Sequence, residues 1–282
     1  MIQATNTLSH TFALCILLMI CIVLVRNPAT AESIPVHHQE GVSRGFPVIR
    51  SLDGKILATG DTIQVADGNK VTSEMVFHFR DGSLYDEKTV FSQDGTFRLL
   101  SDHLIQKGPS FPHPIDIFID CSKNEITIHS NDKGKEKDSI QHMDLPEDLA
   151  DGMLLTLLRN ISPSTAETKL SLLTTSSKPR LIKLSITPKG ERSFTTGGTT
   201  HKACDFAIHV EIGGVAGAVA PLIGKQPPDT HVWMSIGTVP TFVRFEGPLY
   251  DGGPILKAEL AKMRISADNL NLQANQKRPK KN

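Results

Sequence analysis

Four side chains with acid–base and metal-ligand chemistry recur along one short stretch of the sequence. His201, Asp205, His209 and Glu211 are separated by even numbers of residues in "HKACDFAIHVE". In an extended strand such residues share one face, with neighbours about 6.5 Å apart, so imidazole and carboxylate could together bind a metal or transfer a proton. A half-exposed strand is also expected to be polar on one face for solvation alone. These four residues are therefore weak metal candidates, and we predict neither a metal site nor a catalytic residue.

The glycine-rich segment "GGVAGAVAPLIGK", residues 213–225, raises the question of a phosphate-binding loop. Val219 stands where a Walker loop needs its first glycine, and Gln226 stands where the loop needs Ser or Thr. The segment therefore does not fit a nucleotide site. Two interpretations remain open: it covers one end of the fold, or it forms the lip of an apolar cavity. The candidate lip residues are Val215, Val219, Leu222 and Ile223.

Residues 1–31 have the pattern of a secretory signal. The run from Phe12 to Val25 contains fourteen consecutive apolar residues and is followed by the small-residue triplet Ala29-Thr30-Ala31. A helix of that length spans about 21 Å, short of a bilayer core of about 30 Å, so we predict cleavage after Ala31 and export to the periplasm or beyond. No Lys or Arg precedes the run, which keeps an uncleaved, shallow N-terminal membrane anchor as the alternative.

The charge and cysteine content limit the function classes. The chain has 30 Lys plus Arg and 30 Asp plus Glu, so it has no basic field for nucleic acid. Residues 32–42 are predicted to be a flexible mature N-terminus, and residues 266–282 a disordered basic tail. Cys121 and Cys204 remain after signal removal, and they form either one disulfide or, the interpretation we prefer, two buried free thiols.

Four Asp-Gly dipeptides predict successive hairpins, which are the elements that would hold these residues. They begin at Asp53, Asp67, Asp81 and Asp94, spaced 14, 14 and 13 residues apart. Asp-Gly suits a type I′ turn, whose two central residues need positive φ. Apolar and polar residues alternate between these turns, as in "VTSEMVFHF" and "IDIFIDC", which is typical of half-buried strands. The pattern predicts an up-and-down antiparallel meander.

One segment, "LPEDLADGMLLTLLRNISP", predicts an amphipathic helix over about residues 146–161. This prediction places Asp151-Gly152 inside the helix. Strand patterns resume after it and continue to residue 265. The fold class is therefore mainly β: a single domain over residues 43–265 in which a curved antiparallel sheet, or half-barrel, wraps the helix. The apolar stripe of the helix consists of Leu149, Met153, Leu154, Leu157, Leu158 and Ile161.

The segments "LPEDLADGMLLTLL", "GKQPPDTHVW" and "FEGPLYDGGPI" carry a resemblance. The chain resembles uncharacterised bacterial exported proteins related to the LolA/LolB/RseB-type half-barrels, which include lipoprotein carriers and a sigma regulator. The resemblance implies an envelope protein with a cavity between sheet and helix, and it transfers no functional residue to this chain.

The leading hypothesis is a non-enzymatic binding or carrier module for an apolar ligand, either a lipid or an acylated molecule. Its predicted cavity mouth consists of Met153, Leu154, Leu157 and Leu158 of the helix, together with the lip residues of the glycine-rich segment. We expect no cofactor and no nucleic-acid partner, and name the membrane surface as a candidate contact. The alternatives are an envelope-interaction protein whose helix fills the half-barrel and, last, an exported metal-dependent hydrolase that uses the His201 to Glu211 face.

Overall fold

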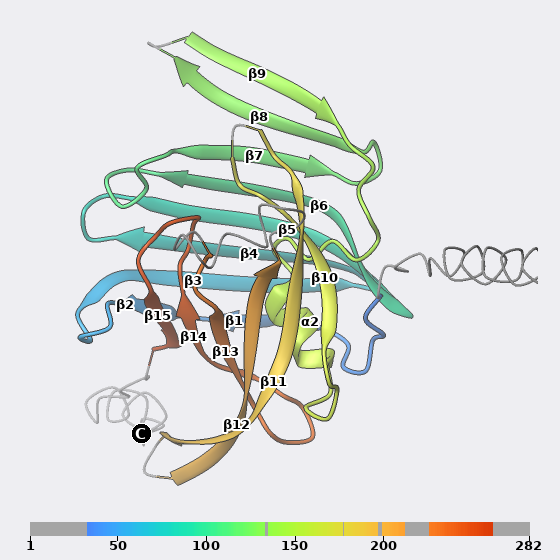
Figure 1. Cartoon of the computed structure of the whole chain (residues 1–282), viewed down its shortest axis with the longest axis vertical. Coiled ribbons are helices and arrows are strands. Elements are labelled where there is room, and N and C mark those ends of the chain that lie inside the picture. Colours follow the sequence, from blue (N-terminus) through green and yellow to red (C-terminus); the bar gives the residue numbers. More distant parts are fainter. Residues whose placement is uncertain (1–32, 133–134, 177, 197–198, 212–225, 262–282) are drawn as a thin grey trace, which may run out of the picture. The chain divides into compact units, whose positions relative to one another are not determined.

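The computed structural model describes residues 33–132, 135–176, 178–196, 199–211 and 226–261 (Figure 1). These residues form fifteen strands and one α-helix, α2 (Leu154–Asn160). The predicted signal, the glycine-rich segment and the basic tail lie outside the described residues. None of the helices among the described residues has the length and apolar content needed to cross a membrane. The strands are β1 (Ser43–Gly45), β2 (Pro47–Arg50), β3 (Ile56–Asp67), β4 (Lys70–Phe79), β5 (Leu84–Asp94), β6 (Thr96–Lys107), β7 (Ile115–Asp120), β8 (Glu125–Asp132), β9 (Lys135–His142), β10 (Thr168–Leu173), β11 (Leu181–Thr196), β12 (Thr199–Glu211), β13 (Thr230–Ser235), β14 (Phe242–Gly247) and β15 (Leu256–Leu260).

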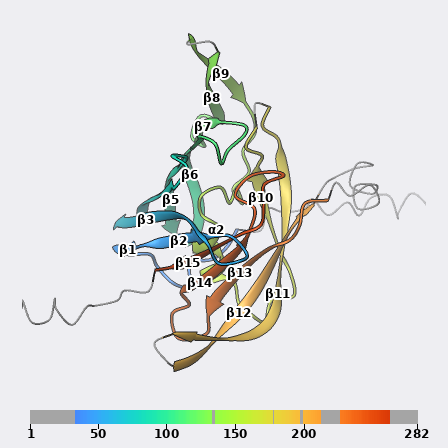
Figure 2. The same cartoon turned by 90° about the vertical axis from the view of Figure 1, so that its left-hand side faces the viewer.

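All strands belong to a single antiparallel sheet, which confirms the predicted fold class. The sheet runs in the order β10 to β15, then β2 to β9, with β1 paired on β3. The pairing of β15 with β2 joins the two ends of the described chain, so each half of the sheet continues into the other. In Figure 2, β10 and β11 lie on one side of α2 and β3 lies on the other. The helix therefore lies between the two halves of the sheet.

The four Asp-Gly dipeptides all lie at hairpins, as predicted. They connect β2 to β3, β3 to β4, β4 to β5 and β5 to β6, and each glycine has a positive φ, between 57° and 93°. The predicted type I′ geometry is wrong, because no aspartate has a positive φ. Among the described residues other than glycine, only Asn124 does. Between β3 and β4 the loop is Gly68-Asn69, with glycine in the first central position that a type II′ turn requires.

One core lies between the sheet and the helix. Phe91, Phe97 and Phe206, from β5, β6 and β12, are each at most 2% exposed. They pack in the same cluster as the helix residues Leu157 and Leu158. At about 25 cal/mol per Å² of apolar surface, burial of these large side chains is the main term holding the two halves of the sheet on the helix.

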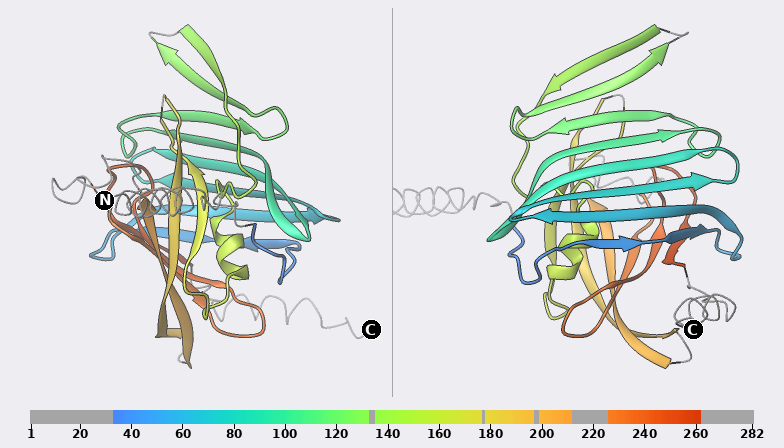
Figure 3. Two further views of the ribbon diagram at one scale, coloured as in Figure 1. Left: turned by 45° about the vertical axis from the view of Figure 1, so that its right-hand side comes forward. Right: turned by 180° about the vertical axis from the view of Figure 1, so that it is seen from behind.

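The helix is shorter than predicted. It begins at Leu154 instead of residue 146, because Asp148–Ala150 pairs with strand β10: Ala150 N donates to Ser171 O at 2.9 Å, and Ser171 N donates to Asp148 O at 3.1 Å. Gly152 then adopts φ +64°, a left-handed conformation that a helix interior excludes. The apolar spacing correctly predicted burial, but only its second half is helical. Figure 3 shows α2 beside β10 in both views.

Candidate functional site

The predicted cavity mouth on the helix lies in the packed core. Met153, Leu157 and Leu158 are 1–2% exposed and Leu154 is partly buried, all four within or against the core cluster. The other predicted lip residues, Val215, Val219, Leu222 and Ile223, lie outside the described residues. Their role at a ligand entrance stays a prediction.

A cleft of about 580 Å³ lies at one end of strands β4 to β7, where the segment after β9 crosses the sheet. This volume is within the range of about 300–1,000 Å³ of small-molecule sites. Its apolar wall consists of Val90, Leu99, Leu100, Phe118, Leu145 and Pro146. Its polar residues are Lys70, Arg98, Ser101, Asp120, Cys121, Ser122 and Glu147.

The shape of the cleft depends on an irregularity in β6. Val90 pairs with Ser101, but the next residue, Phe91, pairs with Leu99, so Leu100 is an extra residue in the ladder. Leu99 is buried, and Leu100 points outward and is 38% exposed. A bulge of this kind re-aims side chains locally. Because of the extra residue, Ser101 also points away from the core, so Leu100 and Ser101 both face the cleft side.

The carboxylates of the cleft are each committed to a cation. Glu147 Oε1 accepts from Arg98 Nη1 at 2.8 Å, and Asp120 Oδ2 lies 2.9 Å from Lys123 Nζ. The Ser122 hydroxyl donates to Asp120, and with Lys123 it lowers the pKa of that carboxyl. Lys70 is exposed, and no ion pair to it exists within the described residues. The uncommitted charge at the rim is therefore positive.

Cys121 and Cys204, the two cysteines among the described residues, are free thiols. Cys121 lines the cleft, where burial, with the charges of Asp151, Asp120 and Asp102, raises its pKa to about 12. Cys204 is buried in the core, and burial raises its pKa as well. The candidate disulfide between them is not formed, and neither thiol is activated as a nucleophile.

Thiol titration checks this result. In chain lacking residues 1–31, purified without reductant, we expect Cys204 to react with a disulfide reagent only on unfolding, because the thiolate is scarce and access is blocked. The denatured, unreduced protein should then yield two thiols. Denatured protein that yields no thiol before reduction would show that the two cysteines are bonded.

Behind Cys121 the core contains a cluster of carboxylic acids that the sequence analysis missed. Tyr85 Oη donates to Glu87 Oε2 at 3.0 Å, and Thr89 Oγ1 donates to Asp102 Oδ1 at 2.7 Å. Asp151, from the turn before α2, accepts from Leu173 N of β10 at 3.1 Å. We call Glu87, Asp102 and Asp151 the acid cluster.

The surroundings of the acid cluster raise the pKa of all three carboxyl groups. Burial, reinforced by the charge of Asp102, raises the pKa of Glu87 to about 8. Burial also raises the pKa of Asp102 to about 6, against the opposing Thr89 hydrogen bond. Burial and the charge of Asp102 raise the pKa of Asp151 well above its usual range. Such a cluster is chemically unusual, but within the described residues no group of three or more His, Cys, Asp or Glu side chains is arranged to hold a metal.

The four polar residues of β12 are not brought together into one site. Asp205 is buried and accepts from His231 Nδ1 at 2.9 Å, so the predicted fully solvated face is wrong at this position. His209 Nδ1 lies 2.7 Å from Asp229, and Lys169 Nζ donates to Glu211 at 2.6 Å. His201 stacks on Phe194 with ring centroids 5.5 Å apart. Each of these side chains has its own separate partner.

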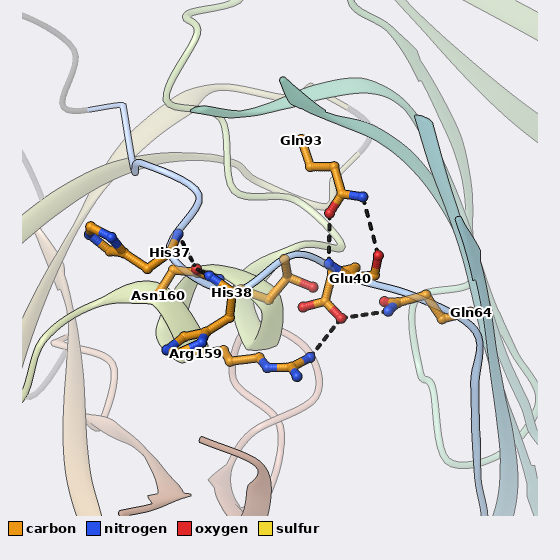
Figure 4. A network of polar contacts seen from close by, with 8 residues as sticks. His37, His38, Glu40, Gln64, Gln93, Arg159 and Asn160 are labelled. Carbon is orange, nitrogen blue, oxygen red and sulfur yellow. Dashed lines mark hydrogen bonds and ion pairs between the residues drawn. The ribbon is translucent and has the colours of Figure 1, made fainter. Parts of the chain in front are cut away.

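The segment before β1 is anchored, and its predicted flexibility is wrong for residues 34–40. Ile34 lies in the core, and Asn160 Oδ1 at the end of α2 accepts from the backbone amides of His37 and His38 at 2.9 and 2.7 Å. Figure 4 shows the buried Glu40 carboxylate accepting from Arg159 Nη1 at 2.8 Å and from Gln64 Nε2 at 2.6 Å. Glu40 therefore fixes this segment to the end of the helix.

Comparisons with known proteins give little further guidance. No protein-family model matches the chain. No curated protein matches it either. One similar solved structure is described as a β-barrel-like protein of a domain of unknown function, DUF1849, from Brucella abortus. The match has a TM-score of 0.44 and 9% sequence identity, and covers 81% of this chain and 100% of that chain. The architecture given above therefore rests on the strand pairing of this chain itself.

Proposed function

We propose that the protein is an exported binding module for an amphiphilic ligand, an acyl chain with an anionic head, held in the cleft at the end of β4 to β7. The observation that supports this proposal is the combination of an apolar wall with an uncommitted cation, Lys70, at the rim. The acyl chain would lie along Leu100, Phe118 and Leu145, with its head near Lys70 and Arg98. The binding site thus differs from the one expected on the helix.

The energetics allow useful affinity. Each buried methylene contributes about 0.8 kcal/mol, so ten methylenes contribute about 8 kcal/mol before the costs of association and ordering. Those costs remove a large part, which leaves an affinity on the order of micromolar. A charged head at an open rim contributes less than the chain, because solvent screens it.

Export is part of the proposal. The apolar run Phe12 to Val25 and the following Ala29-Thr30-Ala31 support passage through a secretory pathway, with a shallow anchor as the alternative. The resemblance to lipoprotein-carrier half-barrels agrees with an envelope role for a ligand that is poorly soluble in water.

Fluorescent fatty-acid titration of delipidated protein tests the proposal. We expect saturable micromolar binding that weakens at least about tenfold in Leu100→Asp, because a carboxylate would face the acyl chain. Lys70→Glu should weaken a fatty acid more than a fatty alcohol of equal length. Lys178→Glu, at an exposed position outside the cleft, is the matched control.

Two results would overturn the proposal. One is wild-type protein that binds no fatty acid and no fatty alcohol. The other is binding that survives unchanged in a folded Leu100→Asp variant, because the ligand would then occupy another site. Circular dichroism of each variant establishes that it is folded.

A second candidate function is an envelope-interaction protein whose helix fills the half-barrel. The burial of Met153, Leu157 and Leu158 against strands of both halves favours this alternative, because it leaves the helix no free apolar face among the described residues. Protein that is purified without detergent and carries no lipid by mass spectrometry, and that fails the titration above, would favour this candidate over the first.

A further inference from the structure

Two histidine–aspartate pairs lie side by side on β6 to β9, on the sheet face opposite the core. His103 Nε2 lies 2.9 Å from Asp116 Oδ1, and His129 Nδ1 lies 2.7 Å from Asp138 Oδ1. The two imidazole rings contact each other, with centroids 6.4 Å apart. Both are about 40% exposed, at 37% and 40%, so an ion in solution can reach them.

Each imidazole uses one ring nitrogen for its aspartate. The remaining nitrogens, His103 Nδ1 and His129 Nε2, have no hydrogen-bond partner within the described residues. A carboxylate that accepts from one imidazole nitrogen fixes the tautomer and makes the other nitrogen a better metal ligand. Both histidines already have this carboxylate support.

The two rings are close enough to share one ion after a short approach. A zinc–nitrogen bond of about 2.0–2.1 Å places a ring centroid roughly 3.2 Å from the metal, so a tetrahedral angle at the ion places the two centroids about 5.2 Å apart. The observed separation is 6.4 Å. Binding therefore requires the two side chains to rotate toward each other by about 1 Å, which their partial exposure to solvent allows.

We propose that His103 and His129 form a two-histidine site for a divalent transition metal, with Zn²⁺ as the ion and water in the remaining positions. Asp116 and Asp138 are positioning residues that orient the imidazoles. With only two protein ligands, affinity on the order of tens of micromolar is expected, well below that of a three- or four-ligand zinc site. The proposal is independent of the cleft.

Calorimetric titration of the full chain with Zn²⁺, purified without a polyhistidine tag, tests the site. We expect one binding event that weakens at least about tenfold in His103→Gln and in His129→Gln. His209→Gln should leave it unchanged, because His209 is 45% exposed and has its own aspartate, Asp229, but makes no ring contact with another histidine among the described residues. Asp138→Asn should weaken binding less than loss of either histidine, because it removes orientation and not a ligand.

Absence of Zn²⁺ binding to the wild-type chain would overturn the proposal. So would binding that is equal in wild type and in both histidine variants, because the ion would then be held elsewhere, for example at His37-His38. All three histidines are exposed, so the variants are expected to fold, and thermal melts without metal check this. A rise in the melting temperature with Zn²⁺ in wild type only would be a second, independent readout.

Discussion

Replacing Gly152 with alanine is expected to lower the free energy of unfolding by about 2–5 kcal/mol. Gly152 has φ +64°, which costs an L-residue about 1–2 kcal/mol. A Cβ there would also lie 1.9 Å from Thr89 Oγ1 and 2.6 Å from Asp102 Oδ1, and overpacking of this kind typically costs a further 1–3 kcal/mol or so. Urea unfolding of the purified variant measures the loss.

Gly252→Ala is the matched control for this prediction. Gly252 has a similar φ, +72°, but nothing lies within 4 Å of its virtual Cβ. The Gly252→Ala variant should therefore lose only the stability that the positive φ costs an L-residue, about 1–2 kcal/mol. Equal losses in the two variants would mean that the contact with Thr89 and Asp102 is relieved without cost. Thr89→Ala in the Gly152→Ala background should recover part of the stability if the clash is the cause.

The second large effect is a loss of stability as the pH rises. The pKa of Glu87 is about 8 in the folded protein against 4.5 for the free side chain, and that of Asp102 is about 6 against 3.8. At pH values between the free and the folded pKa of each group, the folded protein binds more protons than the unfolded chain. Stability therefore falls with increasing pH. The contribution is complete below about pH 4 and is lost progressively up to about pH 8, and each of the two groups accounts for a change on the order of 3–5 kcal/mol.

Chemical unfolding at a series of pH values from 5 to 9 measures this slope. Glu87→Gln keeps an oxygen to accept from Tyr85 but cannot ionise, so the variant should lose less stability over this range than wild type does. Glu74→Gln, which removes an exposed carboxylate paired with Lys88, should keep the wild-type slope. A wild-type stability that rises or stays level from pH 5 to 9 would contradict the raised pKa values of the acid cluster.

The same residues explain which parts of the molecule could be predicted from sequence. Asp-Gly dipeptides predicted four turns correctly, because glycine at positive φ is a local requirement. Period-two alternation predicted that β4 and β7 are half-buried strands, because successive side chains of a strand point to opposite faces.

The acid cluster could not be predicted in this way, because the position of Asp102 depends on a bulge. Phe97 and Leu99 face inward on β6, and the extra residue Leu100 shifts the alternation so that Asp102, Leu104 and Gln106 face inward after it. No local signal in "LLSDHLIQ" announces the inserted residue. Likewise, the start of α2 was misplaced because Asp148–Ala150 pairs with β10, a strand that comes later in the chain.

The pairing of β15 with β2 also has a consequence for the order of events in synthesis. Leu260 lies opposite Pro47, so the two halves of the sheet join only after more than two hundred residues of intervening chain are present. Contacts of such long range fold slowly, and until then β2 has an unpaired edge that invites association with other chains. For any chain that crosses a membrane unfolded, late pairing is instead an advantage. The slowest folding step cannot take place until the last strand has been synthesised and has crossed.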